Sequence, residues 1–177
     1  MAASVEVEHT MFEVLFQRVL VPDAAGRDRL RLLGYDISRS RARYPGTVWR
    51  ACLEEAALQV TPERPREEAL RYLGRAMPMA YLGTMVGRVV RPMLELAGPR
   101  RAMHRASAVF NTVFSNVEST VEDLSPRSWR MRCFRYPAPA EVMAGTLDGG
   151  MDLLGVTGGS VVIERVSGDE QVFLLTI

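Results

Sequence analysis

Hydrophobic periodicity divides the chain into a helical part and a β-rich part. In the first two thirds, apolar residues recur at the three- and four-residue spacing of helices, as over residues 47–61. From Asn116 the period changes to two, the pattern of strands that bury one face. In one such strand, arginines alternate with Trp129, Met131 and Cys133. The sequence therefore predicts helices first and strands afterwards.

The β-rich part consists of two hairpins, at Asn116–Tyr136 and Ser160–Ile177, separated by the apolar, glycine-bearing stretch Pro139–Val156. Acidic residues of the first strand lie opposite arginines of the next, and such cross-strand pairs favour antiparallel pairing. The stretch between the hairpins has helical spacing. The predicted fold class is α+β, with N-terminal helices plus a four-stranded antiparallel sheet built from two hairpins with an intervening helix.

The helical part contains one long apolar segment, which the spacing predicts as a helix over Ala69–Leu96. Pro78 lies within it, and we expect a kink there, because proline lacks an N–H and its ring presses on a preceding carbonyl. Beyond the proline, Gly83 and Gly87 form a small-residue surface that a neighbouring element can approach closely. This helix therefore offers both a bend and a contact surface.

The composition is that of one folded unit. A length of 177 residues and a hydrophobic fraction of 47% are enough for a single core. No linker, repeat or low-complexity segment divides the chain. We expect a single domain over residues 1–177, in which residues 1–60 form a helical N-terminal segment.

Charge and targeting signals narrow the range of partners. All 22 basic residues are arginine and nearly balance 21 acidic residues, so the overall charge is not that of a nucleic-acid binder. The N-terminus lacks the basic flank and apolar run of a signal peptide, which predicts a cytoplasmic protein. The most apolar window, Met77–Leu96, is interrupted by two arginines and two prolines, so we expect no membrane span.

Catalytic signatures are missing from the sequence. It has no nucleophile-elbow, P-loop or dinucleotide-binding motif, and Asp148, Asp152 and Glu164 do not pair with another acid for acid–base work. Cys52 and Cys133 fall in apolar patterns, where cysteine acts as a small core hydrophobe and not as a disulfide partner. We therefore predict no enzyme activity, no metal site and no cofactor.

Two family resemblances come from longer segments. The C-terminal part of the chain resembles the end of the four-vinyl reductase domain and of its relatives, the heme-NO-binding and Golgi-transport ligand-binding superfamily. The residues that carry this resemblance are YPAPAEVMAGTLDGGMDLLGV followed by SVVIERVSGDEQVFLLTI. In that superfamily a proline-led helix with the spacing of Gly145 and Gly149 precedes a final hairpin. The chain is also similar, over nearly its full length, to an uncharacterised family abundant in myxobacteria. The segments that carry this resemblance include FEVLFQRVL, YPGTVWRACLE, the LGR of Leu73–Arg75 and AGPRRAMHR. The resemblance implies a ligand-binding-superfamily core over residues 61–177.

Departures from these families limit what is carried over. Four-vinyl reductase domains often bear clustered cysteines near the final hairpin, and this hairpin has none, so zinc or iron–sulfur binding is not implied. Heme-NO-binding proteins use a proximal histidine on a long helix. His104 is the candidate in the helical core region, but helical spacing turns it away from the Met103–Phe110–Phe114 face. His9 lies near the terminus, so no heme is expected.

The favoured hypothesis is a non-catalytic sensing or signalling module that binds an apolar small molecule. Its pocket would lie between Ala69–Leu96, the helix Met103–Phe114 and the strand Trp129–Cys133. Methionines crowd into the consecutive helices, and such flexible side chains suit variable apolar ligands, although ordinary core filling also explains them. The candidate ligand-binding residues are Tyr81, Met85, Val89, Phe110, Phe114, Trp129 and Met131.

The alternative hypothesis is a dimeric protein-interaction adaptor with no ligand, as the Golgi-transport relatives suggest. Gly83 and Gly87 are the candidate interface residues for a homodimer built on a helical face. The arginine-bearing strand face at Arg130 and Arg132 and the helix edge Arg100–Arg105 are available to a further protein partner. An enzyme is the third and least favoured interpretation.

Overall fold

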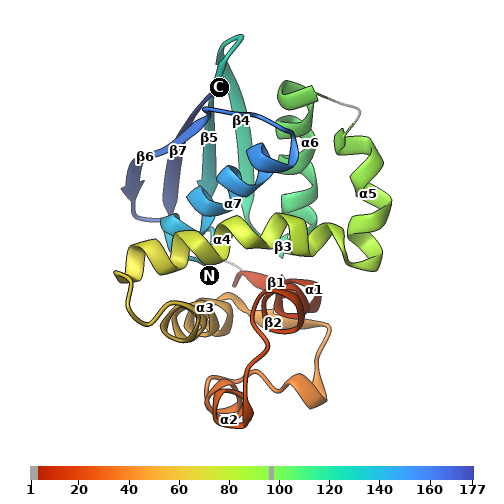
Figure 1. The fold of residues 1–177 in the computed structure, drawn as a ribbon, viewed down its shortest axis with the longest axis vertical. Helices are drawn as coiled ribbons and strands as arrows, with labels where there is room; N and C mark the ends of the chain where they lie inside the picture. The colour runs from red at the N-terminus through yellow and green to blue at the C-terminus, as the bar shows by residue number, and fades with distance from the viewer. Residues whose placement is uncertain (1–3, 96–97) are drawn as a thin grey trace.

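The computed structural model describes residues 4–95 and 98–177, and its main feature is a four-stranded antiparallel sheet covered by helices on one face (Figure 1). The strand order is β4-β5-β7-β6. The strands are β4 (Glu118–Ser125), β5 (Ser128–Phe134), β6 (Ser160–Ser167) and β7 (Glu170–Thr176). The α+β fold class is confirmed, and the sheet is built from two hairpins joined by a helix, as predicted.

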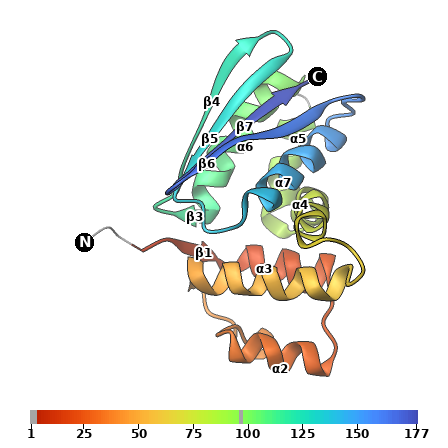
Figure 2. The ribbon, with the colours of Figure 1, turned by 90° about the vertical axis from the view of Figure 1, so that its left-hand side faces the viewer.

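The helices form layers beside and below this sheet. Figure 2 shows α6 and α7 along one face of the sheet, α4 next to α7, and α3 and α2 further away. The helices are α1 (His9–Glu13), the π-helix Val14–Val19, α2 (Ala24–Leu32), the 3-10 turn Ile37–Arg39, α3 (Gly46–Val60), α4 (Arg66–Leu82), α5 (Met85–Glu95), α6 (Gly98–Val113) and α7 (Ala140–Leu153). In the described part of the chain, none is long and apolar enough to cross a membrane.

A second, small sheet was not predicted from the sequence. It has the order β2-β1-β3 and joins β1 (Glu6–Glu8), β2 (Arg43–Pro45) and β3 (Phe114–Ser115). Val7 of β1 pairs with Phe114 of β3, more than a hundred residues later. Strands of two or three residues are too short to show a period, and their partners are distant in sequence. The expectation that everything before Asn116 is helix or loop is therefore wrong.

Helices α4 and α7 cross at very short backbone distance. Gly74 on α4 faces the backbone of α7, and Gly145 and Gly149 on α7 face the backbone of α4. A Cβ at any of these positions would overlap a carbonyl oxygen of the opposite helix. Glycine is therefore required at the crossing, because only a hydrogen side chain lets the two backbones come so close.

Ion pairs flank this crossing and fix its register. Arg71 Nε lies 2.7 Å from Asp148 Oδ2, and Arg75 Nε lies 2.7 Å from Asp152 Oδ2, so two pairs repeat at the four-residue spacing of both helices. A terminal guanidinium nitrogen of Arg71 donates to the carbonyl of Val161 at 2.8 Å. Arg71 thus ties α4 to both α7 and the first residues of β6.

The long helix predicted over Ala69–Leu96 is instead two helices, α4 and α5. Pro78 lies inside α4, and the chain turns later, at Gly83 and Thr84. Thr84 Oγ1 accepts a hydrogen bond from Gly87 N at 3.0 Å, which satisfies a free backbone donor in the first turn of α5. The new helix therefore begins at a capping threonine, well after the proline. Leu96, the predicted end, lies outside the described residues.

The alternation of β5 is as predicted. Trp129, Met131 and Cys133 are buried, and Arg132 is exposed. Arg130 lies on the outer face with Arg132 and forms an ion pair with Glu164 at 2.9 Å. The apolar face of β5 therefore meets the helices.

Candidate functional site

A partly open apolar cavity of about 180 Å³ lies where five helices, α1, α4, α5, α6 and α7, meet β5. Its wall includes the end of α4, Val90 of α5, the inner face of α6 and one face of α7 from Met143 onward. The described lining residues are Met11, Met77, Pro78, Tyr81, Leu82, Val90, Ala102, Met103, Ser107, Phe110, Val113, Met131, Tyr136, Met143, Thr146, Leu147, Gly150, Leu153 and Leu154. None of these carries a charge.

Methionine is the commonest side chain among the described residues of the wall. Met77, Met103, Met131 and Met143 are each at least nine-tenths buried, and together with Met11 they come from five different elements. An unbranched thioether can adjust its rotamers to fill irregular space. The wall can therefore adapt to occupants of different shape more readily than a wall of branched or aromatic side chains.

Two of the four described hydroxyl groups in the wall are satisfied within the chain. Ser107 Oγ donates to the carbonyl of Ser119 at 3.1 Å. Thr146 Oγ1 donates to the carbonyl of Val142 at 2.8 Å, one turn earlier in α7. Both hydroxyls are therefore occupied by neighbouring backbone.

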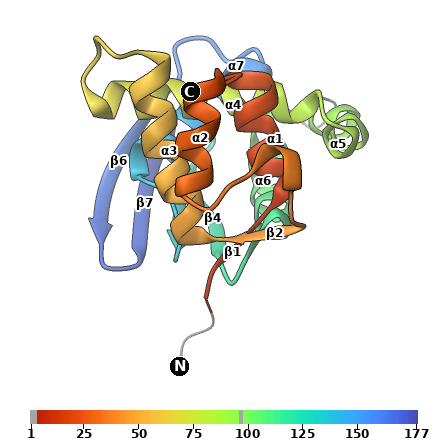
Figure 3. The same cartoon turned by 90° about the horizontal axis from the view of Figure 1, so that it is seen from below.

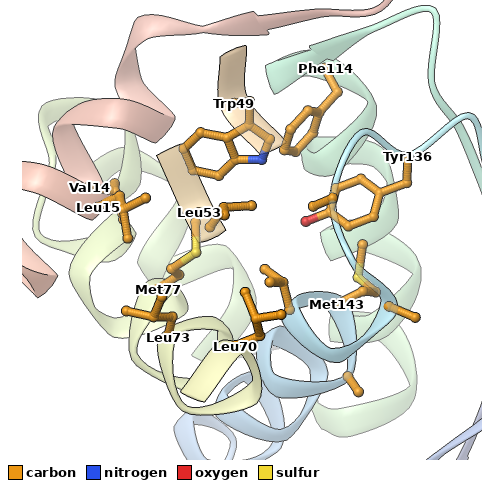
Figure 4. Packing of buried hydrophobic residues seen from close by; sticks show 14 of the residues in the cluster. Val14, Leu15, Trp49, Leu53, Leu70, Leu73, Met77, Phe114, Tyr136 and Met143 are labelled. Atoms are coloured by element: carbon orange, nitrogen blue, oxygen red, sulfur yellow. The ribbon is translucent and has the colours of Figure 1, made fainter. Parts of the chain in front are cut away.

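The other two hydroxyls belong to Tyr81 and Tyr136. Tyr81 Oη is buried and has no hydrogen-bond partner among the described residues. Tyr136 is 7% exposed, and no hydrogen bond to its hydroxyl exists in the described part of the chain either. Figure 4 shows this hydroxyl directed into the interior, in the cluster that holds Phe114 and Met143. Burial raises the pKa of both phenols, so each remains a neutral hydrogen-bond donor.

The structure brings three of the sequence-derived site residues to the cavity. Tyr81, Phe110 and Met131 line it from α4, α6 and β5. Phe114 and Trp129 are each 1% exposed and belong to the surrounding core, where they support the wall without lining it.

Met85 and Val89 are not brought to the cavity. Their exposed fractions are 78% and 72%. Both lie on α5, which Figure 3 shows at the periphery of the molecule. Because the chain turns at Gly83, the apolar stripe of α4 does not continue in line onto α5, and Val90 is the described α5 residue that reaches the wall.

The two glycines predicted at an interface have contacts within the chain. A Cβ at Gly87 would overlap the carbonyl oxygen of Tyr81, so this glycine permits the tight turn between α4 and α5. Gly83 is exposed and lies near the guanidinium of Arg18, with the Cβ position 3.1 Å from its nitrogen. The spacing of these glycines is thus accounted for by local packing.

Sequence reasoning missed the contribution of the segment 136–154. Tyr136, Met143 and Leu147 line the cavity from the loop before α7 and from α7 itself. The helical periodicity of this segment was visible, but many of its residues are apolar, so periodicity alone did not tell which of them face an open space. The α4–α7 crossing decides that.

Histidine and cysteine lie elsewhere. His104 on α6 is exposed, and its Nε2 lies 3.4 Å from Asp123 Oδ1. The ring of His9 packs near that of Tyr35, with centroids 6.4 Å apart. Burial raises the pKa of Cys52 and of Cys133 to about 12, so both thiols stay protonated and unreactive at neutral pH.

One protein-family model covers nearly the whole chain. The family model described as "Protein of unknown function (DUF2378)" matches residues 5–176, so the chain belongs to that family. No curated protein matches the chain.

Solved structures with a similar fold include H-NOX domains. An H-NOX protein from S. oneidensis in the Fe(II)NO ligation state has a TM-score of 0.66 and 10% identity over 95% of this chain and 97% of that chain. A mutant H-NOX from T. tengcongensis has a TM-score of 0.58 and 12% identity over 94% of each chain. An oxygen-binding H-NOX domain related to soluble guanylate cyclases has a TM-score of 0.60 and 12% identity over 94% and 90%. At this identity the likeness is one of fold.

Proposed function

We propose that this protein is a non-catalytic sensing module that binds a small apolar molecule in the cavity between α4, α5, α6, β5 and α7. The observation that carries the proposal is an uncharged, partly open cavity of about 180 Å³ that reaches into the core. Protein interiors are normally packed as densely as organic crystals, so a space that reaches between core side chains is available to a ligand. The likeness to H-NOX structures with bound NO or oxygen supports a ligand-binding role.

The volume limits the size of the ligand. An apolar cavity of about 150 Å³ in another protein holds benzene or xenon, whereas pockets for drug-sized ligands occupy about 300–1,000 Å³. A cavity of about 180 Å³ therefore suits a single aromatic ring or a short aliphatic chain.

The residues present do not fit a heme, the group named for two solved structures of similar fold. Heme iron is held by histidine, cysteine thiolate, tyrosine, or methionine paired with histidine. The described lining residues include neither histidine nor cysteine, and the raised pKa of Tyr81 and Tyr136 disfavours a phenolate ligand. The cavity is also smaller than a tetrapyrrole requires.

Several features support binding without turnover. Both thiols are held protonated, and the described residues contain no group of three or more His, Cys, Asp or Glu side chains that could hold a metal ion. The described part of the wall offers no carboxylate, imidazole or amine to a bound molecule.

The position of the cavity supports a route for signalling. Leu82 ends α4 and Val90 lies in α5, so the wall spans the turn between these helices. A ligand that fits one arrangement of α5 better than another will shift the population toward that arrangement. The exposed face of α5 would then report occupancy to a partner.

A cavity-filling variant tests the binding proposal. Ala102 is 2% exposed and lines the cavity, so Ala102→Leu places new side-chain atoms in the space. Ala108→Leu, at an exposed position on the same helix, is the matched control. Toluene and indole are used as probes in thermal unfolding, in which a ligand of the native state raises Tm.

We expect both probes to raise the Tm of the wild type and of Ala108→Leu, and Ala102→Leu to reduce the probe affinity at least tenfold. The absence of any Tm shift in the wild type at the solubility limit of both probes would contradict the proposal. Equal shifts in all three proteins would place binding outside the cavity and contradict it as well.

A second candidate function, a dimeric protein-interaction adaptor, is favoured by the surface of α5. Met85, Val86 and Val89 expose 78%, 52% and 72% of their surface. Neighbouring apolar side chains on a peripheral helix are typical of a contact surface. Light scattering tests this candidate, since a monomer has a mass of 19.7 kDa. Val89→Glu should abolish self-association through this face, and a monomeric wild type at high concentration would contradict it.

A further inference from the structure

We infer that the cavity selects neutral apolar molecules that carry a hydrogen-bond acceptor. The hydroxyl of Tyr81 or Tyr136 donates a hydrogen bond to that acceptor. This inference rests on the proposed function and specifies its ligand class. It starts from an asymmetry among the described residues of the wall: the hydroxyls of Ser107 and Thr146 are bonded to backbone carbonyls, and those of the two tyrosines are not.

An unpaired hydroxyl in the interior is costly, because folding removes it from water without replacing the lost hydrogen bond. Buried tyrosines therefore normally find a partner. The exception here is the hydroxyl of Tyr81 at the end of α4, and Tyr136 before α7 lines the same space with a hydroxyl that has no partner among the described residues. A ligand acceptor placed in that space supplies the missing partner.

Both tyrosines would act as donors to such a ligand. Burial raises the pKa of each phenol above its ordinary value, so the hydroxyl hydrogen is retained at neutral pH. No charged side chain is present among the described lining residues, so an ionised ligand would lose its hydration without compensation. The ligand class is therefore a small ketone, ether, aldehyde or phenol of about one ring.

A pair of probes with the same shape isolates the acceptor. Acetophenone carries a carbonyl oxygen where α-methylstyrene carries a methylene group. Calorimetric affinities of both probes are measured for the wild type, Tyr81→Phe, Tyr136→Phe and the double variant. Comparing the ratio of affinities between proteins cancels the different hydration of the two probes.

We expect the double variant to bind acetophenone about fivefold more weakly than the wild type, the usual net effect of one hydrogen bond, and α-methylstyrene within about twofold. The single variants identify the donor. If α-methylstyrene binds and the acetophenone affinity is the same in the wild type and the double variant, the acceptor inference fails and the proposed function stands. If neither probe binds the wild type, both fail.

The stability of the free protein gives a second readout. Removing a hydroxyl that has no partner should leave Tm unchanged or raise it in Tyr81→Phe and Tyr136→Phe. Tyr44→Phe is the control, because Tyr44 Oη accepts a hydrogen bond from Arg41 N at 2.9 Å, and its loss should lower Tm. A comparable fall in Tm in the two cavity variants would mean that their hydroxyls are bonded within the protein, which overturns the inference.

Discussion

The N-terminal helices and the cavity-bearing region bury apolar side chains in different ways. In the first region the ring of Phe12 lies 4.6 Å from Tyr35, 4.6 Å from Tyr44 and 4.9 Å from Trp49 between centroids. Phe16 stacks on Tyr35 at 5.4 Å. None of these five rings, which we call the aromatic cluster, lines the cavity. In the second region methionines surround an open space.

The two regions differ in how strongly their side chains restrict the packing. Rigid rings have few rotamers and fit one arrangement, so the aromatic cluster favours a single packing of α1, α3 and the small sheet. Methionines have three flexible torsions and tolerate variable contacts. The region that we propose to bind ligands is therefore the one in which methionines line the open space, beside the rings of Phe110 and Tyr136.

The largest expected effect is on truncation of the aromatic cluster. Phe12→Ala should lower the free energy of unfolding by about 3–5 kcal/mol, because a fully buried ring leaves a void that rigid neighbours cannot fill. Met103→Ala, which only enlarges an existing space, should cost about 2 kcal/mol. Urea unfolding measures both values. Equal losses would show that the two regions do not differ in packing.

Two adjacent glycines of α7 should respond in opposite directions. Gly149→Ala should destabilise the protein by about 1–3 kcal/mol or more, because the new Cβ overlaps the backbone of α4. Gly150→Ala meets no atom within 4 Å, so the gain in helix propensity should stabilise it by about 0.5–1 kcal/mol. Thermal unfolding separates the two outcomes. A loss of stability in Gly150→Ala would contradict the open space at this position.

Alkaline pH should weaken both regions, since each contains one buried thiol. The folded-state pKa of Cys52 and of Cys133 is raised to about 12 from 9.0, so their contribution is complete below pH 9 and is lost as pH rises toward 12. The free energy of unfolding should fall by up to about 1.4 kcal/mol per pH unit for each thiol. Urea unfolding between about pH 8 and pH 10.5 measures this slope. Cys52→Ala should flatten it, and an unchanged slope would rule out that thiol as its cause.

The smallest effect is expected at an exposed ion pair of the cavity region. A hydrogen bond from Arg100 on α6 lowers the pKa of Asp123 on β4 to about 2. This contribution is present above about pH 4 and is lost as pH falls toward about 2. Asp123→Asn should therefore lower Tm slightly at neutral pH and leave it unchanged at the acidic end of this range. Scanning calorimetry measures both values. A large loss at neutral pH would mean that this pair holds α6 against the sheet.

Much of the fold was predictable because its signals are local. The change from helical to two-residue periodicity at Asn116 gave the order of helices and hairpins. Asp23, which follows a proline and precedes a helical pattern, caps α2 by accepting a hydrogen bond from Gly26 N at 2.7 Å. The small sheet was not predictable, because Val7 and Phe114 pair across the chain and neither strand is long enough to show a pattern.

The candidate site was predictable only in part, for a related reason. Tyr81, Phe110 and Met131 lie on long periodic elements that face inward. Met85 and Val89 were assigned by extending one helix through the turn at Gly83 and Thr84, where a side-chain cap starts a new direction.

The sequence by itself determined the α+β class, the inward face of β5 and the lack of catalytic signatures, since these depend on residue type and spacing along the chain. Only the tertiary structure decided where packing leaves space. The approach of Gly74 to α7 and of Gly145 to α4 sets which apolar residues touch and which surround the cavity. The tertiary structure also decided which hydroxyls are bonded. Among the described residues, Ser107 and Thr146 have hydrogen-bond partners and the hydroxyls of Tyr81 and Tyr136 do not. Hydrogen bonding depends on distances between elements, which no local sequence pattern records.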